Sequence, residues 1–361
     1  MIKTILAASW AIGSLVLTAP ASAFTGQPST KPLITDSVYT KPYRLVDVGG
    51  GRRINLYCRG TGSPAVIFSA GGYDSSIAWA LVQPAISKTN TTCSYDRAGM
   101  GFSDAATRPG TSANDVDDIH KALQAAHIKP PYLLVGHSMG GMAVRVFADR
   151  YRDEVVGMVI VDGAHEDQST RLKTIATPEA LAHWDDEGTD TSCMDALKDG
   201  EIPKESPLYK KCVGEPDPRF SKAINDVMLE YSAKAKYQVA TTSEMHNFWG
   251  GASADETRAT RRDFGDMPII VLTHAPHAPA KGITQQLQDQ RTVMWEQFQN
   301  EVAAMSTHGV NEIVPRSTHL INYDRPEIVI DAIHQALAIA AEQRAQRVAT
   351  KHAAHPSEAL P

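Results

Sequence analysis

Glycines flank a serine at the point where the sequence carries its clearest chemical signal. Residues 133–141 read Leu-Leu-Val-Gly-His-Ser-Met-Gly-Gly, so Ser138 lies in a G-x-S-x-G pattern. The pattern alone is weak, because a random chain of this length contains it about one time in ten. Here a buried-type strand precedes it and a helix follows, a turn in which glycines relieve clashes and the serine hydroxyl projects outward. Ser138 is therefore the candidate nucleophile, the alternative being a plain helix cap.

A serine hydroxyl needs a base to take its proton, and the chain offers thirteen histidines. His319 follows the last expected strand and precedes the last expected helix, so it should lie at the same carboxyl edge of a sheet as Ser138. His137 adjoins Ser138 but should point the other way, and several other histidines fall on expected helices. His319 is the candidate base.

Short apolar runs that alternate with helical segments predict the elements that position these residues. Strands are expected at 43–48, 53–58, 65–69, 92–95, 132–135, 155–161, 269–272 and 312–314, and helices at 77–88, 112–127, 139–151 and 326–347. Buried strands that alternate with helices imply a parallel sheet covered on both faces. The fold class is therefore α/β, with a doubly wound and mostly parallel sheet.

One interval breaks this rhythm. Residues 163–266 contain polar helical pieces and turns but no buried-type strand, and we interpret them as a helical cap inserted over the edge of the sheet. The cap divides the core into residues 43–162 and 267–347. A leader at 24–42 precedes the core, and a polar tail at 348–361 follows it.

Several motifs together resemble the α/β-hydrolase superfamily. They are the G-x-S-x-G turn, the loop Ala70-Gly71-Gly72, the order of Ser138 before His319, and residues 96–103, which read Asp-Arg-Ala-Gly-Met-Gly-Phe-Ser. The last segment is similar to the D-x-R-G-x-G-x-S motif of the esterase and epoxide-hydrolase branches, with Ala98 where glycine is usual. The resemblance covers about residues 43–347 and is weakest across the cap. It implies an eight-stranded sheet and the acid, base and nucleophile roles of that family.

The carboxylate that would orient His319 is the catalytic residue least directly assigned from the sequence. The family usually places it after the next-to-last strand, but residues 272–279 contain no carboxylate and the nearest one downstream is Asp289. Asp162 instead ends the strand that follows the nucleophile helix, a position that certain lipases and dehalogenases use. A carboxylate there could accept the imidazole N–H of His319 and hold the required tautomer. Asp162 is the candidate acid; alternatively, it caps the first turn of the cap.

Backbone N–H groups are expected to bind the oxyanion of the reaction. The N–H of Met139, directly after the nucleophile, is one donor. By resemblance Gly72 is the other, with Gly71 or Tyr73 as alternatives. The candidate pocket residues are Tyr73, Phe248 and Trp249. The last two could equally serve only to pack the cap.

These assignments predict a serine hydrolase that cleaves a carboxylic ester through an acyl-enzyme. A serine nucleophile argues against epoxide hydrolysis and dehalogenation, for which this fold uses an aspartate. The same residues could cleave an amide, a peptide or a C–C bond, or carry out cofactor-free perhydrolysis. An alternative from another functional class is an inactive ligand-binding homologue. Such a protein would be expected to have a broken serine turn or to lack the histidine, and neither is seen. The expected partner is a small acyl substrate, and no cofactor or metal is expected.

The N-terminus predicts export. Lys3 precedes an apolar run at 5–17 and the small-residue site Ala21-Ser22-Ala23, the pattern of a signal peptide at 1–23. The run is too short to span a bilayer, so a periplasmic or secreted protein without stable membrane insertion is expected. The net charge of -6 gives no basic footprint for nucleic acid. Nothing in the sequence indicates an oligomeric state.

The four cysteines are interpreted in the light of export. Cys193 and Cys212 share one polar stretch of the cap, which predicts a disulfide in an oxidising compartment. Cys58 and Cys93 could be small core residues. They could also pair, because the second and fourth strands are neighbours in the fold that the chain resembles. No C-x-x-C spacing supports a zinc or redox site.

Overall fold

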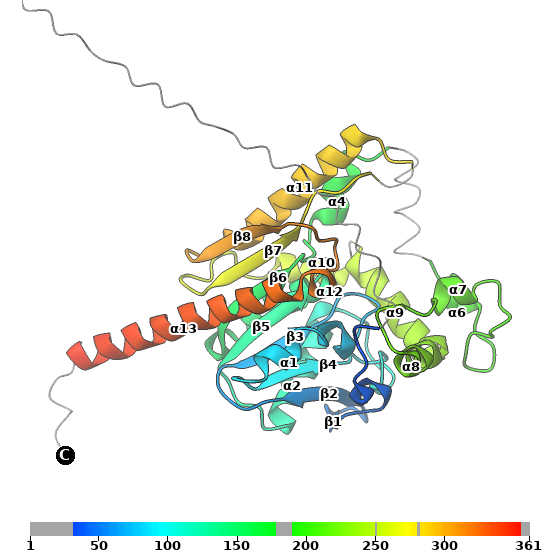
Figure 1. Ribbon diagram of the computed structural model, residues 1–361, viewed down its shortest axis with the longest axis horizontal. Helices are drawn as coiled ribbons and strands as arrows, with labels where there is room; N and C mark the ends of the chain where they lie inside the picture. Colours follow the sequence, from blue (N-terminus) through cyan, green and yellow to red (C-terminus); the bar gives the residue numbers. More distant parts are fainter. Residues whose placement is uncertain (1–31, 178–189, 250, 280–281, 355–361) are drawn as a thin grey trace, which may run out of the picture.

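The computed structural model describes residues 32–177, 190–249, 251–279 and 282–354 of the chain. Its strands are β1 (Leu45–Asp47), β2 (Arg53–Arg59), β3 (Ala65–Ser69), β4 (Thr92–Tyr95), β5 (Tyr132–His137), β6 (Val155–Val161), β7 (Ile269–His274) and β8 (Gly309–Val314). They form one eight-stranded sheet in the order β1-β2-β4-β3-β5-β6-β7-β8 (Figure 1). β2 is antiparallel to both of its neighbours, and the pairs from β4 to β8 are parallel. The predicted eight-stranded, mostly parallel sheet is confirmed.

Helices cover both faces of this sheet. Those outside the interval between β6 and β7 are α1 (Gln83–Ile86), α2 (Ser112–Ala125), α3 (Met139–Arg150), α11 (Gln285–Ala303), α12 (Ile321–Asp324) and α13 (Pro326–Ala354). The side chains of α2 and α3 pack in one apolar cluster with the sheet, whereas those of α1 and α13 pack in another. In the described ranges, no helix is long and apolar enough to cross a membrane.

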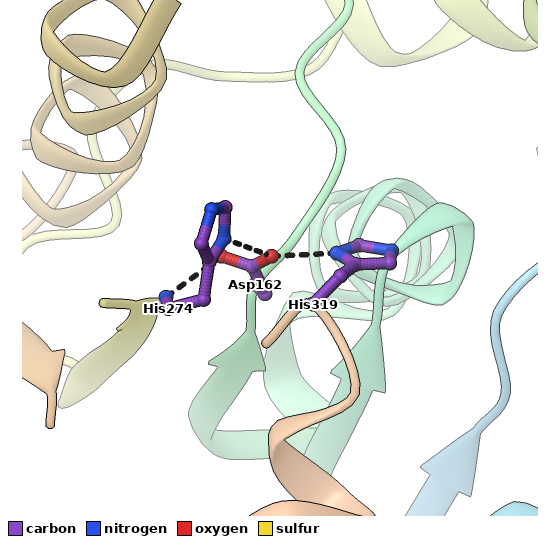
Figure 2. Close-up of side chains that lie close together, drawn as sticks. All are labelled: Asp162, His274 and His319. Carbon is purple, nitrogen blue, oxygen red and sulfur yellow. Dashed lines mark hydrogen bonds and ion pairs between the residues drawn. The ribbon is translucent and has the colours of Figure 1, made fainter. Parts of the chain in front are cut away.

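The carboxyl ends of three neighbouring strands bring chemical groups together. Ser138 follows β5, Asp162 follows β6 and His274 ends β7. The backbone N–H of Ser138 donates to Val161 O at 3.1 Å, and that of Asp162 donates to Leu272 O at 2.7 Å. The backbone hydrogen bonding of the sheet therefore continues through Ser138 and Asp162 and fixes their positions along the strand direction. Figure 2 shows Asp162 between His274 and His319 at this edge.

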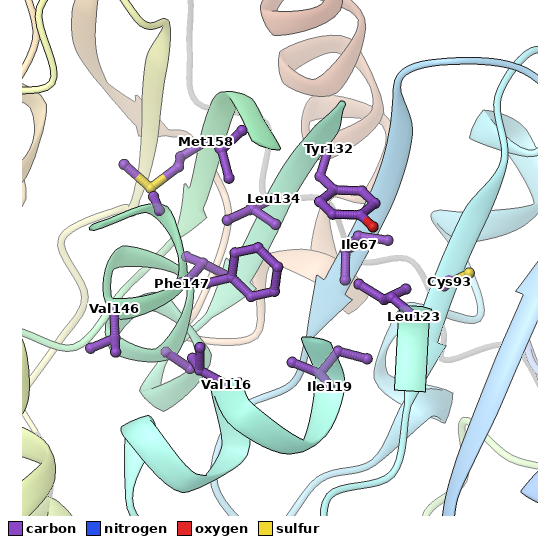
Figure 3. Packing of buried hydrophobic residues seen from close by; sticks show 14 of the residues in the cluster. Ile67, Cys93, Val116, Ile119, Leu123, Tyr132, Leu134, Val146, Phe147 and Met158 are labelled. Carbon is purple, nitrogen blue, oxygen red and sulfur yellow. The ribbon is translucent and has the colours of Figure 1, made fainter. Parts of the chain in front are cut away.

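The middle of the sheet is apolar on both faces, as a parallel sheet requires. Successive side chains of β5 point to opposite faces, so Leu134 joins the cluster of α2 and α3 while Leu133 joins that of α1 and α13. Ile119 of α2 and Phe147 of α3 belong to the cluster around Leu134 (Figure 3). All four side chains are almost fully buried. The packing of these two apolar clusters holds the strands whose ends position Ser138, Asp162 and His274.

The segment between β6 and β7 is helical in its described part. Its helices are α4 (Gln168–Lys173), α6 (Ser192–Asp195), α7 (Tyr209–Cys212), α8 (Lys222–Ala233), α9 (Ala235–Phe248) and α10 (Ala252–Arg258). The cap bounds at 163 and 266 stay a prediction. The predicted signal peptide at 1–23 lies outside the described residues.

A disulfide joins Cys193 of α6 to Cys212 of α7. A second disulfide joins Cys58 to Cys93, which face each other across the β2–β4 pair. Of the alternatives for Cys58 and Cys93, the structure therefore has the bonded pair.

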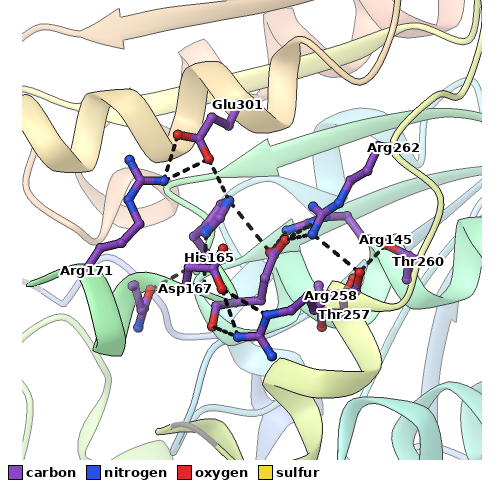
Figure 4. Close-up of polar contacts among 12 residues, drawn as sticks. Arg145, His165, Asp167, Arg171, Thr257, Arg258, Thr260, Arg262 and Glu301 are labelled. Atoms are coloured by element: carbon purple, nitrogen blue, oxygen red, sulfur yellow. Dashed lines mark hydrogen bonds and ion pairs between the residues drawn. The ribbon is translucent and has the colours of Figure 1, made fainter.

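A buried ion network directly follows Asp162 in sequence (Figure 4). Glu166 is completely buried and accepts hydrogen bonds from Arg145 of α3 at 2.7 and 3.1 Å. Arg262, beyond α10, also pairs with Glu166. Burial alone would raise the pKa of Glu166, but the Arg145 guanidinium lowers that pKa to about 2. The carboxylate is thus ionised at neutral pH and ties α3 to the chain after α10.

His165 extends this network to the helices beside it. Its ring stacks on Phe298 of α11 with centroids 4.9 Å apart, and its Nε2 lies 3.4 Å from Glu301. Arg171 of α4 donates to Glu301 at 2.7 Å. Burial lowers the pKa of His165 to about 4. A neutral histidine therefore packs where α4 meets α11.

The lowered pKa values of His165 and Glu166 predict that the protein loses stability in acid. The folded-state pKa of His165 lies below its unfolded value, so the unfolded chain binds the proton more tightly between about pH 6.5 and 4. Stability therefore falls as pH falls through that window, and Glu166 extends the loss to lower pH because its folded pKa is also depressed. Between pH 7 and 4.5, His165→Asn should lose about 2 kcal/mol less stability than the wild type.

Urea unfolding at the two pH values measures this difference. His334→Asn on α13 is the matched control, because it removes an exposed histidine and should leave the pH dependence of the wild type in place. An equal acid loss in wild type and His165→Asn would show that His165 is not the group that titrates.

Candidate active site

Ser138 occupies a strained turn between β5 and α3. Its backbone has φ 52° and ψ -122°, a conformation that a non-glycine residue rarely adopts. A Cβ at Gly136 would lie 2.4 Å from Gly140 O, and one at Gly140 would lie 2.4 Å from Ser69 O. Both glycines of the pattern are therefore required by close backbone approach, which is the physical reason for the spacing around Ser138.

Ser138 opens into a cavity of about 670 Å³. The cavity is lined by Ser138, Ala164, Gln168, Ser169, Leu172, Phe248, Trp249, His274, His277, Gln288, Arg291, Thr292, Trp295, Thr318 and His319. Phe248 and Trp249, both named from the sequence, are thus at the cavity, in edge-to-face contact at 4.9 Å. Tyr73 is 59% exposed and lines a neighbouring groove that also includes Trp249.

The structure brings His319 and Asp162 into direct contact. Nδ1 of His319 lies 2.5 Å from Oδ2 of Asp162, whose side chain is completely buried. Burial alone would raise the pKa of Asp162, but hydrogen bonds from His274 and His319 hold that pKa well below its usual range. Asp289, the alternative, is exposed on α11 and accepts a hydrogen bond from Gln285 one turn away.

Two further residues bind Asp162, and sequence analysis assigned a role to neither. His274 donates its backbone N–H to Oδ1 at 3.0 Å, and its ring Nδ1 lies 2.7 Å from Oδ2. Trp295 of α11 donates its indole N–H to Oδ1 at 2.9 Å. The available signal for His274 was its place after the next-to-last strand, where the family usually has its acid. No signal in the sequence marked Trp295.

His137 supports the loop that carries His319. Burial lowers the pKa of His137 to about 4, so the ring is neutral, and its Nε2 donates to the carbonyl oxygen of His319 at 2.9 Å. The two rings lie 4.8 Å apart. His137 therefore fixes the backbone of the candidate base.

Arg97 braces the loop beside Ser138. A Cβ at Gly71 would lie 3.2 Å from the Cβ of Ser138, so this loop packs directly on the serine. The guanidinium of Arg97 donates to Ala70 O and Gly71 O at 2.9 Å each and pairs with Glu244 of α9 at 2.7 Å. Arg97 thus ties the loop to α9.

Two clusters of described side chains place three His, Asp or Glu ligand atoms within 4.8 Å of one another. They are Asp162, His274 and His319, and His165, Glu166 and Asp167. In the first cluster both ring Nδ1 atoms meet the same carboxylate oxygen at hydrogen-bond distance. In the second the carboxylates pair with arginines. Hydrogen bonds and ion pairs account for both clusters, so we assign neither to a metal.

Comparison with known proteins places this geometry in a family. Residues 64–281 match the model described as alpha/beta hydrolase fold, a stretch that includes Ser138 and Asp162 and ends before His319. The chain is 33% identical over 106 residues to protein YqjL of Bacillus subtilis, covering 29% of this chain and 42% of that protein. It is 24% identical over 199 residues to protein phosphatase methylesterase 1 of Mus musculus, covering 50% of each chain.

The chain thus spans half or less of the length of these two relatives. Among solved structures, that of the epoxide hydrolase CorEH is similar, with a TM-score of 0.58 at 15% identity, covering 81% of this chain and 97% of that one. This likeness shows the fold alone. Since the family model covers more than half of the chain and the sheet has eight, mostly parallel strands, the chain belongs to the α/β-hydrolase fold family.

Proposed function

We propose that this hydrolase cleaves carboxylic esters, with Ser138 as nucleophile, His319 as general base and Asp162 as the acid that orients the base. The observation that carries the proposal is one arrangement. Ser138 and His319 line the same cavity, and Nδ1 of His319 lies 2.5 Å from a buried carboxylate. A strained serine that shares a cavity with a histidine fixed in this way suits acyl transfer.

The ionised carboxylate of Asp162 determines which nitrogen of His319 can accept the proton of Ser138. Asp162 is ionised, so the 2.5 Å contact requires the proton to be on Nδ1 of His319. The neutral ring then has its lone pair on Nε2, which takes the proton of the Ser138 hydroxyl as the oxygen attacks the ester carbonyl. His319 returns this proton to the leaving alcohol. Water then attacks the acyl-enzyme by the same path and releases the acid.

Two backbone N–H groups are suited to the oxyanion. In a trans peptide the C=O and N–H point in opposite directions, so the bond from Arg97 to Gly71 O turns the N–H of Gly72 away from Arg97. The N–H of Met139 lies at the first turn of α3, where the helix dipole favours negative charge. We assign the oxyanion hole to Gly72 and Met139. Removal of one such donor typically costs a hundred- to a thousand-fold in kcat.

The cavity favours a small organic ester over a polymer. Its volume of about 670 Å³ lies within the range of small-molecule sites. Phe248, Trp249, Leu172 and Trp295 supply apolar wall, which suits a hydrocarbon or aromatic acyl group. Amide or peptide cleavage, C–C hydrolysis and perhydrolysis use the same groups and stay alternatives, as does an inactive binding protein. A panel of esters graded by acyl length, with matched amides, separates these chemistries.

Export belongs to the proposal as well. Two disulfides are typical of proteins in oxidising compartments, and we propose a signal peptide at 1–23 and a periplasmic or secreted mature protein. The intact mass of the exported protein should match a chain that begins at Phe24 and lacks four hydrogens. Thiol-reactive label should add four times after reduction and not at all before it. A mass that retains residues 1–23, or label bound before reduction, would contradict the proposal.

The roles of Ser138 and His319 are tested by removing each side chain. Ser138→Ala and His319→Ala should each lower kcat on a chromogenic ester by roughly a million-fold, and the double variant should lose little more, because the residues act as a unit. A phosphonate inhibitor should label the wild type at Ser138, as located by peptide mass spectrometry. Ser169→Ala, which removes another hydroxyl from the cavity, should still be labelled. Label on another residue, or near wild-type kcat in either single variant, would overturn the assignment.

A further inference from the structure

His274 holds the carboxylate of Asp162 at two points. Its backbone N–H donates to Oδ1 at 3.0 Å, and its ring Nδ1 lies 2.7 Å from Oδ2 (Figure 2). The residue ends β7, the strand next to β6, so the sheet itself sets this approach. Its side chain is 17% exposed and lines the same cavity as Ser138. His274 thus stands on the opposite side of Asp162 from His319.

The hydrogen bonds of Asp162 use its full accepting capacity. A carboxylate offers about four lone-pair sites. Oδ2 meets Nδ1 of His319 and Nδ1 of His274, while Oδ1 accepts from Trp295 and from the backbone of His274. An ionised carboxylate can only accept, so each of the two rings has its proton on Nδ1. When such a ring is neutral, its Nε2 lone pair lies on the side away from Asp162.

Two imidazoles consequently share one negative charge on a single oxygen. Each N–H bond to Oδ2 draws charge from that oxygen and weakens its hold on the other ring. We propose that His274 is a positioning residue that fixes Asp162 and divides its charge, so that His319 stays neutral at lower pH than a carboxylate of its own would allow. A neutral His319 is the form that can accept the Ser138 proton, and in this respect the inference rests on the proposed function.

Other ionisable groups lie around His319. The ring of His137 lies 4.8 Å from that of His319, and His277 and Arg291 line the same cavity. Asp324 of α12 accepts from the backbone N–H of Thr318, the residue before His319, at 2.7 Å. Substitution of His274 changes none of these residues, although it removes the ring on which His277 stacks. A change in the titration of His319 therefore reports on the contacts of His274.

The experiment is a titration of His319 by NMR in protein with labelled histidine, assigned by comparison with His319→Ala. In His274→Leu, Oδ2 of Asp162 keeps His319 as its one ring partner, while Oδ1 keeps the donors Trp295 and the backbone N–H of residue 274. The titration midpoint of His319 should therefore rise by about one pH unit. In His274→Asn a carboxamide N–H stands near the place of Nδ1, and the midpoint should return toward the wild-type value. His277→Leu is the matched control: His277 stacks on His274 and lines the cavity, but its Nδ1 lies against Ala278 O and not Asp162. It should leave the midpoint where it is.

The low-pH limb of kcat/KM should move with these midpoints. An unchanged or lowered midpoint in His274→Leu, or equal shifts in the Leu and Asn variants, would overturn the inference. Nitrogen chemical shifts of the wild type give a test that needs no variant: a neutral His274 with its proton on Nε2 would also overturn it. Because the titration requires no turnover, its result is independent of the phosphonate test of Ser138, and the two proposals can fail separately.

Discussion

The carboxylate of Asp162 is ionised and has no contact with water, so each of its lone pairs must meet a donor or the buried charge would cost several kcal/mol. Four N–H groups from three parts of the chain meet this need: the end of β7, helix α11 and the loop after β8. These parts are far apart in sequence. The folded arrangement of the site therefore depends on one side chain that they surround.

The backbone around Asp162 extends this constraint to the nucleophile. Asp162 itself has φ 47°, the left-handed conformation, which turns the chain sharply away from the sheet. The next residue packs against the start of α3, where a Cβ at Gly141 would lie 2.9 Å from the Cα of Gly163. Gln299 of α11 donates to Gly163 O at 2.7 Å. The turn at Ser138 and the turn at Asp162 are thus packed on each other, and the backbone N–H of Ala164 donates to Ser138 O at 2.9 Å.

Local patterns were sufficient to predict much of this architecture. The apolar runs located the strands because a parallel sheet buries both faces, and the glycines around Ser138 marked a turn whose close backbone approaches are visible in the structure. One expected helix, at 77–88, is instead a 3-10 turn at Ser76–Trp79 followed by α1. Pro84 lacks an N–H and fits only the first turn of a helix, so the helix restarts at Gln83.

The positions of Ser138, Asp162 and His319 could be inferred because each follows a strand at one edge of the sheet. His274 and Trp295 could not, since their contacts with Asp162 depend on how β7 and α11 pack beside β6. Sequence spacing does not encode that packing. The sequence shows that no carboxylate follows β7. It does not show that His274, which ends β7, contacts Asp162.

Asp162→Asn tests the central claim most directly, because it keeps the shape of the side chain and removes its charge. The amide favours the wrong tautomer of His319, and kcat on an ester should fall by up to about ten-thousand-fold while the circular dichroism spectrum is unchanged. Asp289→Asn, a change of the same kind on the exposed face of α11, should retain kcat close to that of the wild type. An Asp162→Asn enzyme that turns over at the wild-type rate would contradict the account, and so would a loss confined to Asp289→Asn.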